Sequence, residues 1–79
     1  MANTQTTPAT VEELRQLFGR RVAFLRKEKG ITQEELARKM KVDTVFVAYI
    51  EGGRRSPSFV NLHQLSKALE VHPVELFRF

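Results

Sequence analysis

The chain has no cysteine, and its 79 residues contain no apolar run near the roughly 18 residues that cross a bilayer. Without cysteine the protein has no disulfide framework and no zinc site with thiolate ligands. The opening residues, MANTQTTPAT, contain neither a basic stretch nor an apolar one, so they show no secretory signal. We therefore expect a cytoplasmic protein that does not bind a membrane.

Residue sets that would carry catalysis or hold a metal are also missing. The two histidines, His63 and His72, lack the neighbouring ligands that a metal site needs. There is no Ser-His-acid arrangement and no glycine-rich phosphate loop, because Gly52 and Gly53 follow a helical segment and stop it. The sequence predicts a protein that is not an enzyme and that binds no metal or cofactor.

Length and charge indicate a small basic domain. Thirteen Lys and Arg residues against nine Asp and Glu residues give a net charge of +4. A chain of this length forms one domain and buries only about 60% of its unfolded surface. Positive charge favours a polyanionic partner such as nucleic acid, but ordinary soluble surfaces have the same balance, so charge alone does not identify the partner.

Helix caps divide the chain. Residues 1–9 are small and polar and are expected to form a disordered tail before a domain over residues 10–79. Thr10 with Glu13 is a capping-box pair, so a first helix should begin near residue 11 and end at Gly30. The stripe expected to face inward has helical spacing and consists of Val11, Leu14, Phe18, Val22 and Leu25.

Four more helices follow from the same signals. Thr32 with Glu35 predicts a helix over residues 33–39, and Asp43 predicts one over 44–51. Ser58 should cap a helix over 59–69, and Pro73 should open a short fifth helix. No segment alternates convincingly like a strand, so the predicted fold is all-α. The helix over 59–69 is expected to bury Phe59, Leu62, Leu65 and Leu69.

The segment over residues 33–52, QEELARKMKVDTVFVAYIEG, predicts two short helices joined by a tight turn. Small Ala37 suits a close helix crossing, and the residues expected to face inward around it are Leu36, Met40, Val42, Val47 and Ile50. This pattern indicates a helix-turn-helix unit, whose second helix enters the DNA major groove. An ordinary helical hairpin has the same spacing.

Three segments strengthen the interpretation: FGRRVAFLRKEKGITQEELARK, VAYIEGGRRSPS and LHQLSKALEVHPVELF. Over about residues 18–77 they resemble the lambda-repressor/Cro-like (XRE) family of helix-turn-helix regulators. The resemblance implies a five-helix DNA-binding domain with the helix-turn-helix at its second and third helices. It also implies a homodimer that binds a near-palindromic site on double-stranded DNA.

The resemblance assigns roles to individual residues. Gln33, at the start of the second helix, would contact the DNA backbone, and Arg26 would form a largely buried ion pair with Glu51. Arg54 and Arg55 would lie beside phosphates. The full set expected at DNA is Thr32, Gln33, Thr44, Val45, Phe46, Ala48, Tyr49, Arg54 and Arg55. The weaker candidates are the scattered cations Arg20, Arg21, Lys27, Lys39 and Lys41. The apolar C-terminus would form the dimer interface through Val74, Phe77 and Phe79.

Two features depart from the family pattern. Lys41 stands where the family commonly has glycine, so either the turn is strained, at a cost of about 1–2 kcal/mol, or it is built differently. The third helix lacks the Arg, Lys, Asn and Gln side chains that normally read bases.

An apolar third helix leaves two functions open. It can read AT-rich DNA by shape and by contacts with thymine methyl groups, or it can bind protein, as in an antitoxin or a bridging factor. The aromatic side chain of Phe46 is similar to a tyrosine at that place in some restriction–modification controller proteins.

Overall fold

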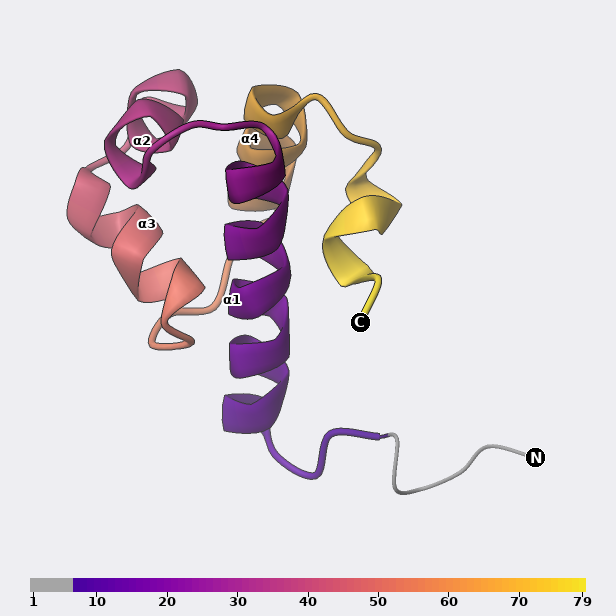
Figure 1. Ribbon diagram of the computed structural model, residues 1–79. Coiled ribbons are helices and arrows are strands. Elements are labelled where there is room, and N and C mark those ends of the chain that lie inside the picture. Colours follow the sequence, from indigo (N-terminus) through magenta and orange to yellow (C-terminus); the bar gives the residue numbers. More distant parts are fainter. Residues whose placement is uncertain (1–6) are drawn as a thin grey trace.

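The computed structural model describes residues 7–79, and within them it is all-helical (Figure 1). The elements are α1 (Val11–Glu28), α2 (Gln33–Met40), α3 (Thr44–Glu51), α4 (Phe59–Leu69) and a final 3₁₀ helix, η2 (Pro73–Phe77). Most of the expected disordered tail lies outside the described residues. Of its last residues, Ala9 donates its N–H to Glu13 Oε1 at 3.0 Å, next to the first turn of α1.

The last element differs from the expected fifth α-helix, because η2 is a 3₁₀ helix of five residues. Pro73 at its start has no N–H to donate, and the Glu75 N–H reaches the His72 carbonyl three residues back. A segment this short has no room for successive α-helical hydrogen bonds. The described chain thus has four α-helices and one tight terminal turn.

Side-chain caps set the helix boundaries. At α2, Thr32 accepts from the Glu35 N–H and Glu35 accepts from the Thr32 N–H, which completes a capping box. The backbone and hydroxyl hydrogen bonds from Thr32 also hold the pKa of Glu35 below its usual value. Ser58 and Asn61 form an equivalent box at α4. At the end of α1, Gly30 has a φ of 74°, a conformation that glycine adopts without strain.

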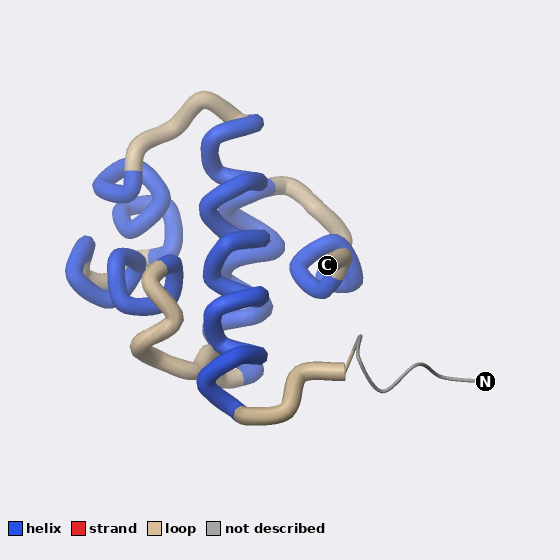
Figure 2. The backbone as a smooth tube through the Cα atoms, turned by 60° about the horizontal axis from the view of Figure 1, so that its bottom comes forward, coloured by secondary structure: helices blue, strands red, loops and turns tan. Residues whose placement is uncertain are grey.

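The core lies where α2 is packed against both α3 and α4, while α1 contacts α3 and η2 (Figure 2). Ala37 is 1% exposed, so its small side chain lies at a close helix contact. The other fully buried large side chains come from all five elements: Val22, Leu36, Val47, Ile50, Leu65 and Leu76. In both ribbon views α3 and η2 lie on opposite sides of α1.

Three residues expected in the core are instead on the surface. Val11 is 60% exposed, Leu14 44% and Phe59 89%. Phe59, the first residue of α4, lines the same pocket as Val11 and Leu14. For those two residues the reason is the length of α1, whose 18 residues span about 27 Å, whereas the eight residues of α2 or α3 span about 12 Å. The first turns of α1 therefore extend past the short helices, and helical spacing there does not produce burial.

The turn between α2 and α3 is strained rather than rebuilt. Lys41 has φ 61° and ψ 43°, the left-handed conformation that the glycine of related turns adopts freely. Its N–H still closes the end of α2 on the Arg38 carbonyl at 3.2 Å. The helix-turn-helix angle is thus kept at the expense of backbone strain in a lysine.

Replacing Lys41 with glycine should raise the free energy of unfolding by about 0.5–1 kcal/mol. Relief of left-handed strain exceeds the extra entropy that glycine has in the unfolded chain. Urea denaturation measures the change, and Lys41→Gln is the matched control because it removes the charge and keeps the strain. Equal free energies of unfolding for the two variants would contradict the claim that backbone strain at Lys41 destabilises the protein.

Candidate nucleic-acid interface

The start of α2 is held in place by a polar side chain that spans two helices. Gln33, the first residue of α2, is half-buried and donates from Nε2 to Glu51 Oε1 at 2.9 Å. Glu51 is the last residue of α3. Thr32 caps the same end of α2. These contacts therefore fix the position of the first turn of α2, with its free N–H groups, relative to α3.

Beneath this contact lies an ion pair between α1 and α3. Arg26 Nε lies 2.6 Å from Glu51 Oε2, and Arg26 Nη2 lies 3.1 Å from Glu51 Oε1. Arg26 Nη1 also donates to the Ile31 carbonyl at 2.8 Å. The two side chains are only 12% and 6% exposed. A bidentate, shielded pair of this kind fixes orientation as well as charge, so it locks the end of α3 to α1.

The outer face of α3 is largely apolar. Val45 is 54% exposed and Tyr49 36%, while Thr44 and Ala48 are half-buried. Phe46 was expected to be exposed, but it is half-buried and packs against the core. Its ring spans the border between core and surface because a phenylalanine is large enough to reach both.

The loop after α3 brings two cations to this face. The Arg54 guanidinium carbon lies 5.0 Å from the centre of the Tyr49 ring, and that of Arg55 lies 5.5 Å from the centre of the Phe46 ring. The Arg54 N–H bonds the Tyr49 carbonyl at 2.8 Å, which folds the loop onto α3. Cation–π contacts at exposed sites contribute about 0.5–1 kcal/mol each, enough to bias a side chain toward one position.

Sequence reasoning placed these two arginines at the interface but treated the aromatic residues as a separate problem. The structure pairs each arginine with one ring of α3. The loop therefore brings planar guanidinium groups to α3, a helix that has no Arg, Lys, Asn or Gln side chain of its own. Aromatic residues on a helix followed by arginines in a tight loop were the signal that could have suggested this.

The element that contains Val74 and Phe77 of the expected dimer interface, η2, lies on the other side of α1 from α3 (Figure 1). Val74 is 51% exposed, Phe77 47% and Phe79 52%. The Phe77 ring lies 5.2 Å from that of Phe18 and 6.4 Å from that of Phe79. The C-terminal aromatic residues thus form one connected group on the surface.

Further apolar residues extend this group. Two shallow pockets of about 410 and 320 Å³ meet at Phe59, Leu62 and Phe77. Their apolar lining also comes from α1 and η2, so we define the apolar face as Val11, Leu14, Phe18, Phe59, Leu62, Val74 and Phe77. Phe18 is buried at the base of this face, as its helical spacing predicts, whereas the same spacing wrongly indicates a core for Val11, Leu14 and Phe59.

Residues 7–79 contain neither a cluster of metal ligands nor a membrane-spanning helix. No group of three or more His, Cys, Asp and Glu side chains there can hold a metal ion. Nor does any helix of that part have the length and hydropathy to cross a membrane.

Known proteins share this arrangement. The helix-turn-helix family matches residues 22–76. The HTH-type transcriptional regulator y4dJ of Sinorhizobium fredii is 41% identical over 64 residues, 81% of this chain and 83% of that protein. Control protein C.MunI of Mycoplasma sp. is 39% identical over 61 residues, 76% of this chain and 82% of that protein.

Among solved structures, the restriction-modification controller protein C.AhdI from Aeromonas hydrophila is similar with a TM-score of 0.78 and 41% identity. The match covers 80% of this chain and 96% of that one. The sequence and the fold therefore both match known helix-turn-helix regulators. The chain belongs to the XRE-type helix-turn-helix family of DNA-binding transcriptional regulators.

Proposed function

We propose that the protein is a dimeric, sequence-specific transcriptional regulator of the restriction–modification controller type. In this proposal it binds a near-palindromic operator with α3 in the major groove. The observation that carries the proposal is the position of Arg54 and Arg55 over the rings of Tyr49 and Phe46. The arrangement gives α3 the cationic, planar donors that recognition of double-stranded DNA requires.

The contacts proposed for α3 follow from its residues. The major groove is about 12 Å wide and accepts a helix. Val45, Ala48 and the Thr44 methyl group would contact thymine methyl groups, and the Tyr49 hydroxyl would make a single hydrogen bond. A helix of this composition favours AT-rich sequence, with the loop arginines bound to phosphates.

Anchoring to the DNA backbone would come from α2. The free N–H groups of its first turn, together with the Thr32 hydroxyl and the Gln33 amide, suit a phosphate. Because Gln33 is bonded to Glu51, a phosphate held there also fixes the depth of α3. These contacts position the protein and carry no sequence information themselves.

Replacing Arg55 with alanine should weaken binding to every duplex and lower the slope of log affinity against log salt by about 1, because one phosphate contact is lost. Fluorescence anisotropy at several salt concentrations measures both quantities. Lys67→Ala, on α4, is the matched control, and it should leave both unchanged. An unaltered salt slope in the Arg55 variant would remove this residue from the interface.

The apolar face is proposed as the dimer interface. Its most exposed side chain, Phe59, is 89% exposed between two apolar pockets, so the same surface offers both a projection and a recess. A two-fold contact needs such self-complementarity, since each copy inserts into the other. With α3 on the far side of α1, pairing here would turn both recognition helices outward, as half-sites about 34 Å apart require.

Replacing Phe59 with serine should raise the dimer dissociation constant at least about 100-fold. A dimer loses two phenylalanines, each contributing about 1.5–3 kcal/mol by burial. Analytical ultracentrifugation measures the constant. Phe24→Ser is the control, because Phe24 is 51% exposed but lines neither apolar pocket. Equal constants for the two variants would mean that the dimer forms elsewhere.

A protein-binding module on the same fold is the second candidate. Its support is the exposed Val45 on α3, since an apolar helix surface also suits a protein partner. The stacked arginines favour DNA, because a purely apolar docking surface gains nothing from two cations at its edge.

A further inference from the structure

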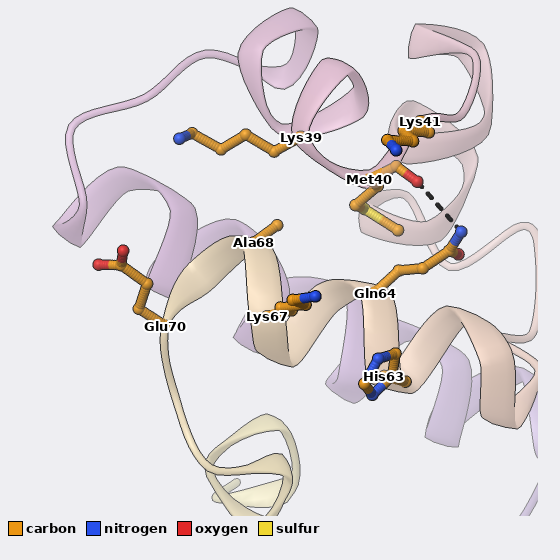
Figure 3. Close-up of a pocket in the computed structure, with 8 residues that line it drawn as sticks. All are labelled: Lys39, Met40, Lys41, His63, Gln64, Lys67, Ala68 and Glu70. Atoms are coloured by element: carbon orange, nitrogen blue, oxygen red, sulfur yellow. Dashed lines mark hydrogen bonds between the residues drawn. The ribbon is translucent and has the colours of Figure 1, made fainter.

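A second basic surface lies beside the helix-turn-helix. A pocket of about 380 Å³ opens between the end of α2 and α4 (Figure 3). Three lysines line it, Lys39 and Lys41 from the end of α2 and Lys67 from α4, together with His63. We call this set the lysine pocket. The lysine pocket shares no residue with the set proposed to contact DNA on α2, α3 and the following loop.

The charges of the lysine pocket are free to meet a partner. Each of its three lysines is exposed, and within residues 7–79 none is in a salt bridge. The one acidic lining residue, Glu70, already pairs with Lys29 at 2.5 Å. Alongside the hydrogen bond from Lys29, the charge of Lys39 also helps to lower the pKa of Glu70, but three lysines against one glutamate still leave the pocket with an excess of positive charge.

The side chains of these lysines are not needed to finish α2, although the backbone N–H of Lys41 closes it. The last carbonyl of that helix, at Met40, accepts from Gln64 Nε2 at 3.0 Å, as Figure 3 shows. Lys41 is also strained, with φ at 61°, where glycine would be relaxed. A strained residue at a functional surface is a recurrent feature of proteins, and here the strain keeps a cation at the mouth of the pocket.

The layout of the cations distinguishes an extended partner from a single small anion. In Figure 3 the Lys39 amine points away from the side of the pocket where Lys41, Lys67 and His63 lie. The positive groups are thus spread along the surface and do not converge on one point. Between them Met40 and Ala68 supply a buried apolar floor.

We propose that the lysine pocket binds an acidic segment of a partner protein. An extended peptide can place successive carboxylates beside separated ammonium groups and lay its aliphatic carbons on the apolar floor. A rigid duplex could meet the exposed lysines only from outside, whereas an extended peptide can also reach the floor of the pocket. This interaction is independent of the proposed DNA contacts, so each can hold without the other.

A labelled oligo-glutamate peptide is the probe. Its affinity is measured by fluorescence anisotropy for the full chain, for the pocket variant K39Q/K41Q/K67Q and for the control variant R20Q/K27Q/R38Q. Both variants lower the net charge from +4 to +1, and the control residues are exposed and line no pocket. The pocket variant should lose at least about tenfold in affinity and the control less than about threefold.

Two further readouts complete the test. Amide shifts on adding the peptide should centre on Met40, Gln64 and Ala68, and the pocket variant should keep its duplex DNA affinity. Equal losses in both variants, or shifts centred on α3, would overturn the proposal in favour of general charge attraction. A matching loss of duplex affinity would make the pocket part of the DNA surface. Thermal melting checks folding, and Lys67→Gln alone replaces the pocket variant if it melts early.

Discussion

Replacing Gly19 with alanine should destabilise the protein by about 2–3 kcal/mol, although alanine is the better helix former by about 1 kcal/mol. Gly19 is buried in the middle of α1. A Cβ there would lie 2.3 Å from the Ile50 carbonyl oxygen and 2.6 Å from that of Glu51. Both are backbone atoms, so no side-chain rotation relieves the overlap, and α1 must move away from the end of α3.

Urea denaturation measures this loss, which should also lower the melting temperature by roughly 10 °C or more in a domain of this size. Gly30→Ala is the matched control, because Gly30 has φ 74° and open space around its Cβ position. That variant should lose only about 1 kcal/mol, from backbone strain alone. A Gly19 variant as stable as the natural protein would show that α1 and α3 do not meet at this point.

Replacing Glu51 with alanine should cost about 3–5 kcal/mol, because it leaves the shielded Arg26 charge without its partner. It also removes the acceptor of the hydrogen bond that Gln33 Nε2 donates to Glu51 Oε1 at 2.9 Å. A small domain has a total stability of about 4–12 kcal/mol, so the variant is expected to be partly unfolded near room temperature. DNA affinity should fall with it, since both α2 and α3 lose their common anchor.

A double-mutant cycle separates the charge effect from general packing. Replacing both members, as Arg26→Met with Glu51→Leu, should be less damaging than removing Glu51 alone, because no unpaired charge remains. Chemical denaturation of the two single variants and the double variant gives the coupling energy. Strictly additive losses would mean that the ion pair contributes no more than its separate side chains.

Local signals in the sequence were enough to place the α-helices. Thr32 with Glu35, and the N-caps Asp43 and Ser58, predicted helix starts that the structure has at the same residues. Such caps depend on residues three apart, so no tertiary knowledge is needed. The last segment escaped the same reasoning, because the choice between α and 3₁₀ geometry depends on length and packing rather than on Pro73.

Tertiary contacts lay beyond the sequence patterns. Helical spacing made Val11, Leu14 and Phe59 look like core residues, and periodicity cannot distinguish an intramolecular core from a surface that another molecule covers. The role of Gly19 was invisible for a similar reason. Its need for space comes from a backbone 31 or more residues away in the chain, Ile50 and Glu51.

The arrangement of the proposed DNA surface is the part that the sequence predicts least well. The sequence shows that α3 is poor in base-reading groups and places the arginines that follow it beside phosphates, but it does not show that they stack on α3. The stacking of Arg54 on Tyr49 and of Arg55 on Phe46 depends on how the loop folds back. Aromatic and cationic residues that looked like separate features together form one surface.

Selection from a random library of duplex DNA, performed at two salt concentrations, tests the central claim most directly. The account predicts enrichment of an AT-rich, near-palindromic site whose half-sites lie about one helical turn apart, with binding that weakens at the higher salt. It also predicts that the Phe59→Ser variant enriches the palindrome poorly. No enriched sequence at low salt from a folded, dimeric protein would contradict DNA recognition by α3 and favour a protein-binding module.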